Sequence, residues 1–333
     1  LTRNFRPSIR RQERATPPPN AGGAVLGVYR CAPSRRALIS GAALALTPLR
    51  ALAQGVATPF LVVGDWGERS GDQSLVAAAM ADVAAAIGSR FVISTGDNFY
   101  RRGVSSVEDP QWTETFERVF SAPSLQTRWY AVLGNHDYRG SVAAEMDYTI
   151  TSARWRMPAR YWAEDMILAD GATATFFFLD TFPLTHLPGM RAHIPIVGDA
   201  SEAHAQLRWL EENLAACAST WKIAVGHHPV LSSGSHGASP ALRTHLKPLF
   251  ERYGVRAYFN GHDHNLEHLS DAGVDYICSG AGSESRPLAE IQPQSRFADR
   301  GPGFAACALN GDEMGLRLHD GAGAVLYETS ITR

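Results

Sequence analysis

Short runs of consecutive apolar residues recur along the chain from residue 59 onward. The runs are PFLVVG (59–64), FVISTG (91–96), WYAVLG (129–134), TATFFFLD (173–180), WKIAVG (221–226), VRAYFNG (255–261) and VDYICSG (274–280). Apolar residues follow one another in these runs instead of alternating with polar ones. This pattern predicts short strands that are buried on both faces.

Two longer segments between these runs have the pattern of helices. Residues 72–88 are rich in alanine and end in a glycine, and residues 201–217 repeat apolar side chains at helical spacing. Strands that alternate with helices predict an α/β fold. In such folds, polar side chains gather in the loops at the carboxyl ends of the strands, where ligands bind.

Five of the predicted strands end in a glycine that is followed directly by Asp, Asn or His. These ends are GDWG with Asp65, GDNFY with Asp97 and Tyr100, GNHDY with Asn135 and His136, GHHP with His227 and His228, and GHDHN with His262 and His264. Glycine permits the sharp turns and close backbone contacts that a crowded polar site requires. One such turn is common in any protein, whereas five in this order indicate a single site.

The residue types at these strand ends are metal ligands. Carboxylate and phenolate oxygens favour a hard, highly charged ion, while imidazole nitrogens suit iron, zinc and other divalent transition metals. Two such ions close together can bind a phosphate ester and activate water for in-line attack. The sequence therefore predicts a site for two metal ions of different character.

The same motifs carry a family resemblance. Their order resembles that of the calcineurin-like metallophosphoesterases, and the tyrosine of GDNFY narrows the resemblance to purple acid phosphatases. GDNFYRRGV, LGNHDYRG, GHHPVLSSGSHG and NGHDHNLEHL are most similar to the small, tartrate-resistant type. The resemblance covers about residues 59–285. It implies an α/β fold of the metallophosphoesterase type, a β-sandwich of two mixed sheets flanked by helices in four layers, with the metals at one edge.

The resemblance also implies a role for each residue of the site. Ferric iron would be held by Asp65, Asp97, Tyr100 and His264, and a divalent ion (Fe, Zn or Mn) by Asp97, Asn135, His227 and His262. Asp97 would bridge the two ions. The implied reaction is hydrolysis of phosphate monoesters by an acid phosphatase, in which a hydroxide held by the metals attacks phosphorus in line.

Two further histidines match positions that face the substrate in the family, His136 and His236. They would orient the phosphate, stabilise the oxygens of the transition state or protonate the leaving alkoxide. The role of His228 is open, because the family often has an aromatic residue there. Asp137 and Asn265 are expected to shape their loops, and the remaining histidines to be solvated or structural.

Two other functions compete with the monoesterase. A metal-dependent phosphodiesterase or nucleotidase of the same superfamily would use the same cluster, although Tyr100 argues against most of these enzymes. A phosphate-binding or adhesion module that has lost catalysis is the third hypothesis, and the full ligand set argues against it. The chain also departs from the tartrate-resistant type, since Thr185 and Ala241 stand where the animal enzymes have a disulfide. Residues 186–201, where that type carries a loop over the active site, have their own sequence.

The first 53 residues differ from the rest of the chain. They carry nine arginines and one glutamate, whereas the remainder has 22 basic and 32 acidic residues, a net charge of −10. Arg35 and Arg36 precede an apolar stretch and the small residues Ala51-Leu52-Ala53, which predicts a twin-arginine-like signal peptide within residues 1–53. We therefore expect a catalytic domain over residues 54–333, periplasmic or secreted and without a membrane span once the signal is removed.

The charge and the cysteines exclude several other functions. The acidic remainder lacks the basic surface that nucleic acid requires. The partner that the resemblance implies is a small phosphate ester or a phosphoprotein. The cysteines after residue 53 are Cys217, Cys278 and Cys307, an odd number without CxxC spacing. They predict no zinc finger or redox motif and allow one disulfide without fixing its pair.

Overall fold

The structure, a computed structural model, describes residues 56–188 and 200–333. The predicted signal peptide and most of the predicted active-site loop, residues 189–199, lie outside the described residues. So does the predicted domain boundary at residue 54. No helix of the described part has the length and hydropathy needed to cross a membrane.

The described chain forms two mixed sheets of seven strands each. The first sheet has the order β14 (Val325–Thr332), β13 (Glu313–Asp320), β12 (Gly303–Leu309), β1 (Thr58–Val63), β2 (Phe91–Ser94), β3 (Arg128–Ala131) and β4 (Trp155–Arg156). The second sheet has the order β11 (Ser295–Asp299), β9 (Leu266–Asp271), β10 (Val274–Ser279), β8 (Ala257–Asn260), β7 (Trp221–Val225), β6 (Thr173–Phe178) and β5 (Trp162–Ile167).

Each sheet contains four neighbouring parallel strands. Strands β1 to β4 are parallel in the first sheet, as are β6, β7, β8 and β10 in the second. The antiparallel pairs are those that bring in β12, β13 and β14, or β5, β9 and β11. The predicted fold of two mixed sheets is confirmed.

The continuous apolar runs have a simple physical cause. Along β1, Phe60 and Val62 belong to the core between the sheets, whereas Leu61 and Val63 belong to a second core on the outer face of the first sheet. Alternate side chains of a strand point to opposite faces, and here both faces are covered. In contrast, the edge strands β5 and β14 alternate between covered and exposed positions.

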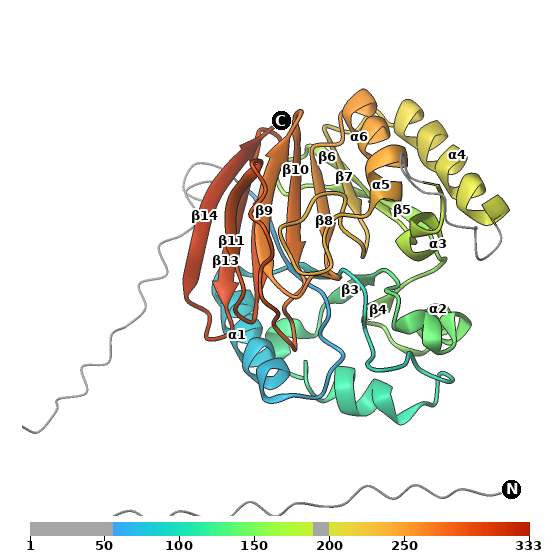
Figure 1. Cartoon of the computed structure of the whole chain (residues 1–333). Helices are drawn as coiled ribbons and strands as arrows, with labels where there is room; N and C mark the ends of the chain where they lie inside the picture. Colours follow the sequence, from blue (N-terminus) through green and yellow to red (C-terminus); the bar gives the residue numbers. More distant parts are fainter. Residues whose placement is uncertain (1–55, 189–199) are drawn as a thin grey trace, which may run out of the picture. The chain divides into compact units, whose positions relative to one another are not determined.

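The helices cover the outer faces of the sheets, as Figure 1 shows. They are α1 (Gly71–Ile87), α2 (Val142–Thr151), α3 (Thr181–Thr185), α4 (Ala200–Ala216), α5 (Pro240–His245) and α6 (Lys247–Tyr253), with shorter helical turns at Trp112–Glu117, Pro123–Leu125 and Asp137–Arg139. Helix α1 packs on the first sheet, and α4, α5 and α6 pack on the second. The two helices predicted from the sequence are confirmed, and α1 ends as expected at Gly88 in a left-handed conformation.

Candidate metal centre and phosphate site

The predicted ligands follow the carboxyl ends of five parallel strands. Strands β1, β2 and β3 of the first sheet lead to the turns with Asp65, with Asp97 and Tyr100, and with Asn135 and His136. Strands β7 and β8 of the second sheet lead to the turns with His227, and with His262 and His264. The structure brings these turns together where the two sheets meet.

Tyr100 lies at the centre of the first predicted ligand group. Its hydroxyl is 2.8 Å from Asp97 Oδ2, 3.0 Å from Asp65 Oδ1 and 3.2 Å from His264 Nε2. His264 Nε2 is in turn 3.4 Å from Asp65 Oδ1. The four residues that the sequence assigned to ferric iron therefore direct their oxygens and one nitrogen at a common point. Burial and the two neighbouring carboxylates raise the pKa of Tyr100 well above its usual value.

The second predicted ligand group shares Asp97 with the first. His227 Nε2 is 3.5 Å from Asp97 Oδ2, 3.3 Å from Asn135 Oδ1 and 3.3 Å from His262 Nδ1. Asp97 Oδ2 thus faces Tyr100 on one side and His227 on the other. The structure brings all seven predicted metal ligands together, with the Asp97 carboxylate between the two groups.

Each of the two aspartates divides its oxygens between the backbone and the site. Asp65 Oδ2 accepts the His262 N–H at 2.9 Å, and Asp97 Oδ1 accepts the His136 N–H at 2.8 Å. The other oxygen of each carboxylate faces Tyr100. Because one oxygen is fixed by a backbone donor, the direction of the other is fixed as well, which is how ligands are oriented around a metal.

Glycines leave room for these carboxylates. A Cβ atom on Gly134 would lie 2.1 Å from Asp97 Oδ1, and one on Gly261 would lie 2.2 Å from Asp65 Oδ2. Any other residue at either position would displace a ligand. This agrees with the close backbone contacts that the sequence motifs predict.

Three of the ligands have an unusual backbone. Asp65, Asp97 and His262 have φ values of 55°, 50° and 69°, in the left-handed region that non-glycine residues seldom adopt. Such conformations cost free energy and persist only where the surrounding structure imposes them. The residues with this strained backbone come from both predicted ligand groups.

Asp137 holds together the two turns that carry Asp97 and Asn135. Its buried carboxylate accepts the backbone N–H groups of Gly134 at 2.7 Å, Asn98 at 3.0 Å and Phe99 at 3.1 Å. It also accepts the Asn98 side-chain amide at 3.2 Å. This is the loop-shaping role that the sequence suggested for Asp137.

The protonation of His227 shows that the site suits a cation. Its Nδ1 lies 2.9 Å from the carbonyl oxygen of Thr95, which can only accept, so Nδ1 carries a proton, and in the neutral ring Nε2 has the lone pair. That lone pair faces oxygens of Asp97 and Asn135, which are acceptors too. Burial disfavours the imidazolium, yet the carboxylates of Asp97 and Asp65 raise the pKa of His227 to about 9. The pocket therefore stabilises positive charge, and its donor set fits two metal ions.

His136 and His236, the two predicted substrate-side histidines, lie beside the ligands. The His136 ring is 4.4 Å from that of Tyr100, and its Nδ1 is 3.1 Å from the Arg101 carbonyl oxygen. The His236 ring is 4.5 Å from that of His262, and 35% of its side chain is exposed. The structure thus places one of them on each side of the centre.

Sequence reasoning missed the partners of His236. Its Nδ1 is 3.3 Å from the buried carboxylate of Asp263, and its Nε2 accepts from the Arg286 guanidinium at 2.9 Å. Asp263 is the middle residue of GHDHN, so its place between two predicted ligands was a signal that could have been used. Arg286 follows β10 and carried no comparable signal.

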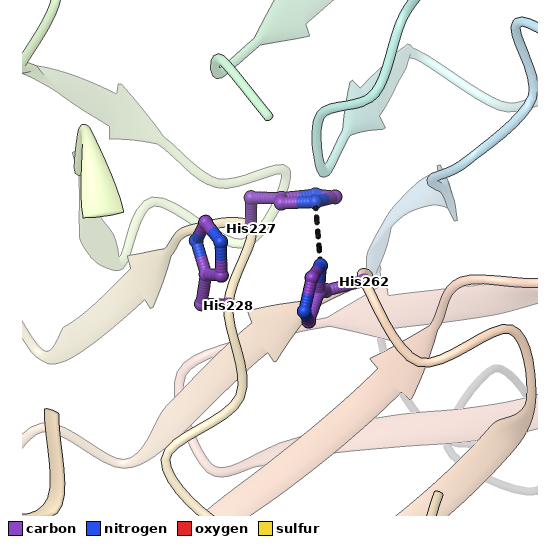
Figure 2. Close-up of side chains that lie close together, drawn as sticks. All are labelled: His227, His228 and His262. Carbon is purple, nitrogen blue, oxygen red and sulfur yellow. Dashed lines mark hydrogen bonds between the residues drawn. The ribbon is translucent and has the colours of Figure 1, made fainter. Parts of the chain in front are cut away.

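Thr181 was also missed, and it contacts His227 and His228. Its hydroxyl oxygen accepts the backbone N–H of both histidines, at 3.2 and 3.0 Å, and lies 2.9 Å from His228 Nδ1. Figure 2 shows His228 beside His227 and His262, with the dashed line joining the last two. The three imidazoles could also hold a metal ion by proximity alone, since one nitrogen of each lies within 4.8 Å of the others.

Other predicted residues lie outside this centre. His268 and His319 are buried, the first against Asp275 and Tyr327 and the second stacked on Phe304, which agrees with the structural role expected of them. The three described cysteines are free thiols, so no disulfide forms among them.

Comparisons with known proteins agree on the family to which this chain is similar. The model of the calcineurin-like phosphoesterase family matches residues 58–266. Purple acid phosphatase 17 of Arabidopsis thaliana is 36% identical over 286 residues, covering 81% of this chain and 82% of that protein. Tartrate-resistant acid phosphatase type 5 of Homo sapiens is 36% identical over 310 residues, covering 86% of this chain and 94% of that protein.

A solved structure extends the comparison to the fold. GAP50, described as the anchor in the inner membrane complex of Plasmodium, matches with a TM-score of 0.76 at 25% identity. The match covers 84% of this chain and 89% of that one. The same architecture is therefore found in proteins named for catalysis and in one named for anchoring.

Proposed function

Because this chain belongs to the purple acid phosphatases, within the calcineurin-like metallophosphoesterase family, we propose that it hydrolyses phosphate monoesters at a centre of Fe(III) and a divalent ion. The observation that carries the proposal is the convergence of seven potential ligands from five strand ends on the two sides of the Asp97 carboxylate. The divalent ion is Fe, Zn or Mn.

The chain divides the ligands between the two ions as the motifs suggest. Asp65, Tyr100 and His264 would hold the iron, Asn135, His227 and His262 would hold the divalent ion, and Asp97 would contact both. When bound, the metal pair supplies positive charge that neutralises the phosphate ester and makes water a stronger nucleophile.

His236 and His136, which lie beside the centre, would act on the substrate directly. The Asp263 carboxylate lies 3.3 Å from His236 Nδ1 and orients the ring, so that Nε2 would be the atom that delivers a proton to the leaving alkoxide. For this transfer the Arg286 guanidinium, which donates to Nε2 in the structure, must turn toward the substrate. His136 has its Nδ1 tied to the Arg101 carbonyl, which leaves its Nε2 to orient the phosphate.

The reaction is tested by comparing two substrates. We expect p-nitrophenyl phosphate to be hydrolysed with a higher kcat/KM than bis(p-nitrophenyl) phosphate. A clear preference for the diester would overturn the monoesterase and favour the phosphodiesterase or nucleotidase of the same superfamily.

The metals are tested by colour and composition. A tyrosinate bound to Fe(III) gives a broad visible absorption band, so we expect a coloured protein that contains iron and a second metal in about equal amounts. Tyr100→Phe should remove the band. A colourless protein with two zinc or manganese ions, unchanged by the substitution, would contradict the iron assignment.

A second candidate function is a binding module without catalysis, which the similarity to the Plasmodium anchor protein favours. The complete ligand set and both substrate-side histidines argue for the enzyme instead. Turnover of p-nitrophenyl phosphate that is lost in Asn135→Ala would exclude the binding module, because this substitution removes one ligand and leaves the outer surface unchanged.

The location of the protein is also part of the proposal. The arginine pair and apolar stretch within residues 1–53 support export to the periplasm or beyond by the twin-arginine route, with residues 54–333 as the mature enzyme. Arg35→Lys combined with Arg36→Lys should keep the protein in the cytoplasmic fraction. Unchanged export of this variant would refute the twin-arginine route.

A further inference from the structure

Among the described residues, His228 is the one imidazole at the centre without a role in the reaction proposed above. It is buried, with 6% of the residue exposed. Its ring lies 4.5 Å from that of His262 and 4.9 Å from that of His227 (Figure 2). Proximity alone would make it a third nitrogen ligand for the divalent ion.

The hydrogen bonds of Thr181 decide which nitrogen of His228 carries the proton. A hydroxyl group has two acceptor positions and one hydrogen to donate. The Thr181 oxygen already accepts the N–H groups of His227 and His228, so both acceptor positions are used. Its contact with His228 Nδ1 must therefore be a donated hydrogen bond. Nδ1 then holds a lone pair, and the proton of the neutral ring is on Nε2.

The two adjacent histidines are thus held in opposite tautomers. The Thr95 carbonyl accepts from His227 Nδ1 and leaves a lone pair on Nε2, as a metal ligand requires. The Thr181 hydroxyl donates to His228 Nδ1 and leaves an N–H on Nε2, which a metal ion cannot bind without removing the proton. Nε2 is therefore available for coordination in His227 and for hydrogen-bond donation in His228.

His228 is also fixed in place with its donor unused. Its backbone N–H donates to Thr181, and its carbonyl oxygen accepts the Tyr258 hydroxyl at 2.7 Å. Within residues 56–188 and 200–333, no group forms a hydrogen bond with Nε2. A rigid N–H without a partner, beside the ligands of the divalent ion, is suited to bind an oxyanion.

We propose that His228 is a substrate-binding residue whose Nε2–H donates a hydrogen bond to a non-bridging oxygen of the phosphoryl group, and that it does not coordinate a metal. This inference rests on the proposed function, since it requires phosphate to bind at the centre. It adds a donor at a position where the family often has an aromatic residue.

Two substitutions at His228 separate its two nitrogens. Asn places a carbonyl oxygen near the position of Nδ1 and has nothing at Nε2, whereas Gln places an amide donor near Nε2. Both variants should retain the metal content of the unmutated protein. Because a hydrogen bond to a charged group contributes about 1.5–3 kcal/mol, His228→Asn should weaken binding of inorganic phosphate to the metal-loaded protein about 10-fold or more. His228→Gln should bind phosphate within about three-fold of the unmutated protein.

Calorimetric titration with inorganic phosphate, metal analysis and thermal unfolding together decide the outcome. A loss of one metal ion in both variants would overturn the proposal in favour of a third imidazole ligand. Lower unfolding temperatures with unchanged phosphate affinity would overturn it in favour of a structural histidine. If the unmutated protein neither binds phosphate nor hydrolyses p-nitrophenyl phosphate, the proposed function fails. If it does both and His228→Asn does so equally well, only this inference fails.

The tautomer can be read directly, even if the Asn variant does not fold. In ¹⁵N spectra of the zinc-loaded protein, which is diamagnetic, His228 should show a protonated Nε2 and an unprotonated Nδ1. The assignment comes from the signals that His228→Gln removes. Thr181→Ser, which keeps the hydroxyl, should leave this pattern unchanged, and Thr181→Val should produce a mixture of tautomers. A protonated Nδ1 in the unmutated protein would overturn the proposal.

Discussion

The two sheets contribute different chemistry to one site. The strand ends of the first sheet carry the proposed oxygen ligands, Asp65, Asp97, Tyr100 and Asn135, and those of the second sheet carry the proposed nitrogen ligands, His227, His262 and His264. A carboxylate offers lone pairs on both of its oxygens, so the residues that support it need only fix its direction. An imidazole offers a lone pair on only one nitrogen at a time, so its tautomer must also be chosen.

The supporting residues differ accordingly. The oxygen ligands are aimed by backbone N–H groups and by Asp137, which collects four N–H donors from the turns around them. On the nitrogen side, the Thr95 carbonyl accepts from His227 and selects its tautomer, and the Thr181 hydroxyl donates to the neighbouring His228 and selects the opposite one. The comparison teaches that the supporting residues of an oxygen ligand fix its direction, whereas those of a histidine fix its proton as well.

The largest effect should come from Asp97, which belongs to both ligand groups. Loss of a residue that only supports a ligand lowers metal affinity or activity by about 10–100-fold, so Asp97→Ala should lower kcat/KM by more than about 100-fold. Metal analysis should find both ions lost. His262→Ala, which removes a ligand from the nitrogen side alone, is the matched variant and should retain the iron. Retention of both ions in Asp97→Ala would show that the two groups do not share this carboxylate.

A smaller effect should follow from weakening the support on the oxygen side. Asp137→Asn replaces one carboxylate oxygen with an amide that faces the N–H donors of Gly134, Asn98 and Phe99. We expect the affinity for the divalent ion, measured by metal titration, to fall about 10–100-fold. The unfolding temperature should also fall, since buried N–H groups lose their acceptor.

Asp109→Asn is the control for this experiment. Asp109 also accepts backbone N–H groups, from Ser105 at 2.8 Å and Gln111 at 2.9 Å, but none of these residues belongs to the site. The control should lower stability without changing metal affinity. Equal metal affinities in the two variants would mean that Asp137 supports the fold and not the ligands.

The last prediction concerns stability instead of metal binding, at Asp180, which connects the two sides. This buried carboxyl follows β6 of the second sheet and accepts the hydroxyl of Tyr138, from the turn after β3, at 2.5 Å. Burial raises the pKa of Asp180 to about 7, against the opposing effects of Tyr138 and Arg160. A carboxyl whose pKa is higher in the folded protein stabilises the fold while it is protonated. Its contribution is complete below about pH 4 and is lost as the pH rises through about 7.

Asp180→Asn should remove this dependence, because the amide stays neutral. Three units of pKa correspond to about 4 kcal/mol, so the free energy of unfolding of the variant should gain up to that amount relative to the unmutated protein between about pH 4 and pH 8. Urea unfolding of both proteins at matched metal loading measures the difference in their free energies of unfolding. The contributions of the other titratable groups cancel in this difference. A difference that does not change with pH would contradict the raised pKa of Asp180.

Much of the fold could be predicted from the sequence, because its signals are local. The continuous apolar runs required strands covered on both faces, and the glycine turns marked where these strands end. The helix ending at Gly88 was predicted from its composition and terminal residue. The family assignment followed from the same motifs and is confirmed by the relatives.

The rest depends on contacts between distant parts of the chain. The sequence did not show which strand belongs to which of the two sheets, since strands buried on both faces look alike in either sheet. Thr181 lies 46 residues before His227, and no spacing rule connects a hydroxyl with the tautomer of a histidine. A signal was present, however, because the run 173–180 also ends in a polar residue, Asp180, and is followed by Thr181, although without the glycine that marked the other five.

The spread of the ligands from residue 65 to residue 264 has a consequence for the order of events during maturation. While only one sheet has formed, the chain offers oxygens without imidazoles or imidazoles without oxygens. Tight binding of both metals therefore requires that the two sheets have docked. Metal uptake would then mark the completion of folding. With iron bound as proposed, colour that develops during refolding would report the last tertiary step and not the first.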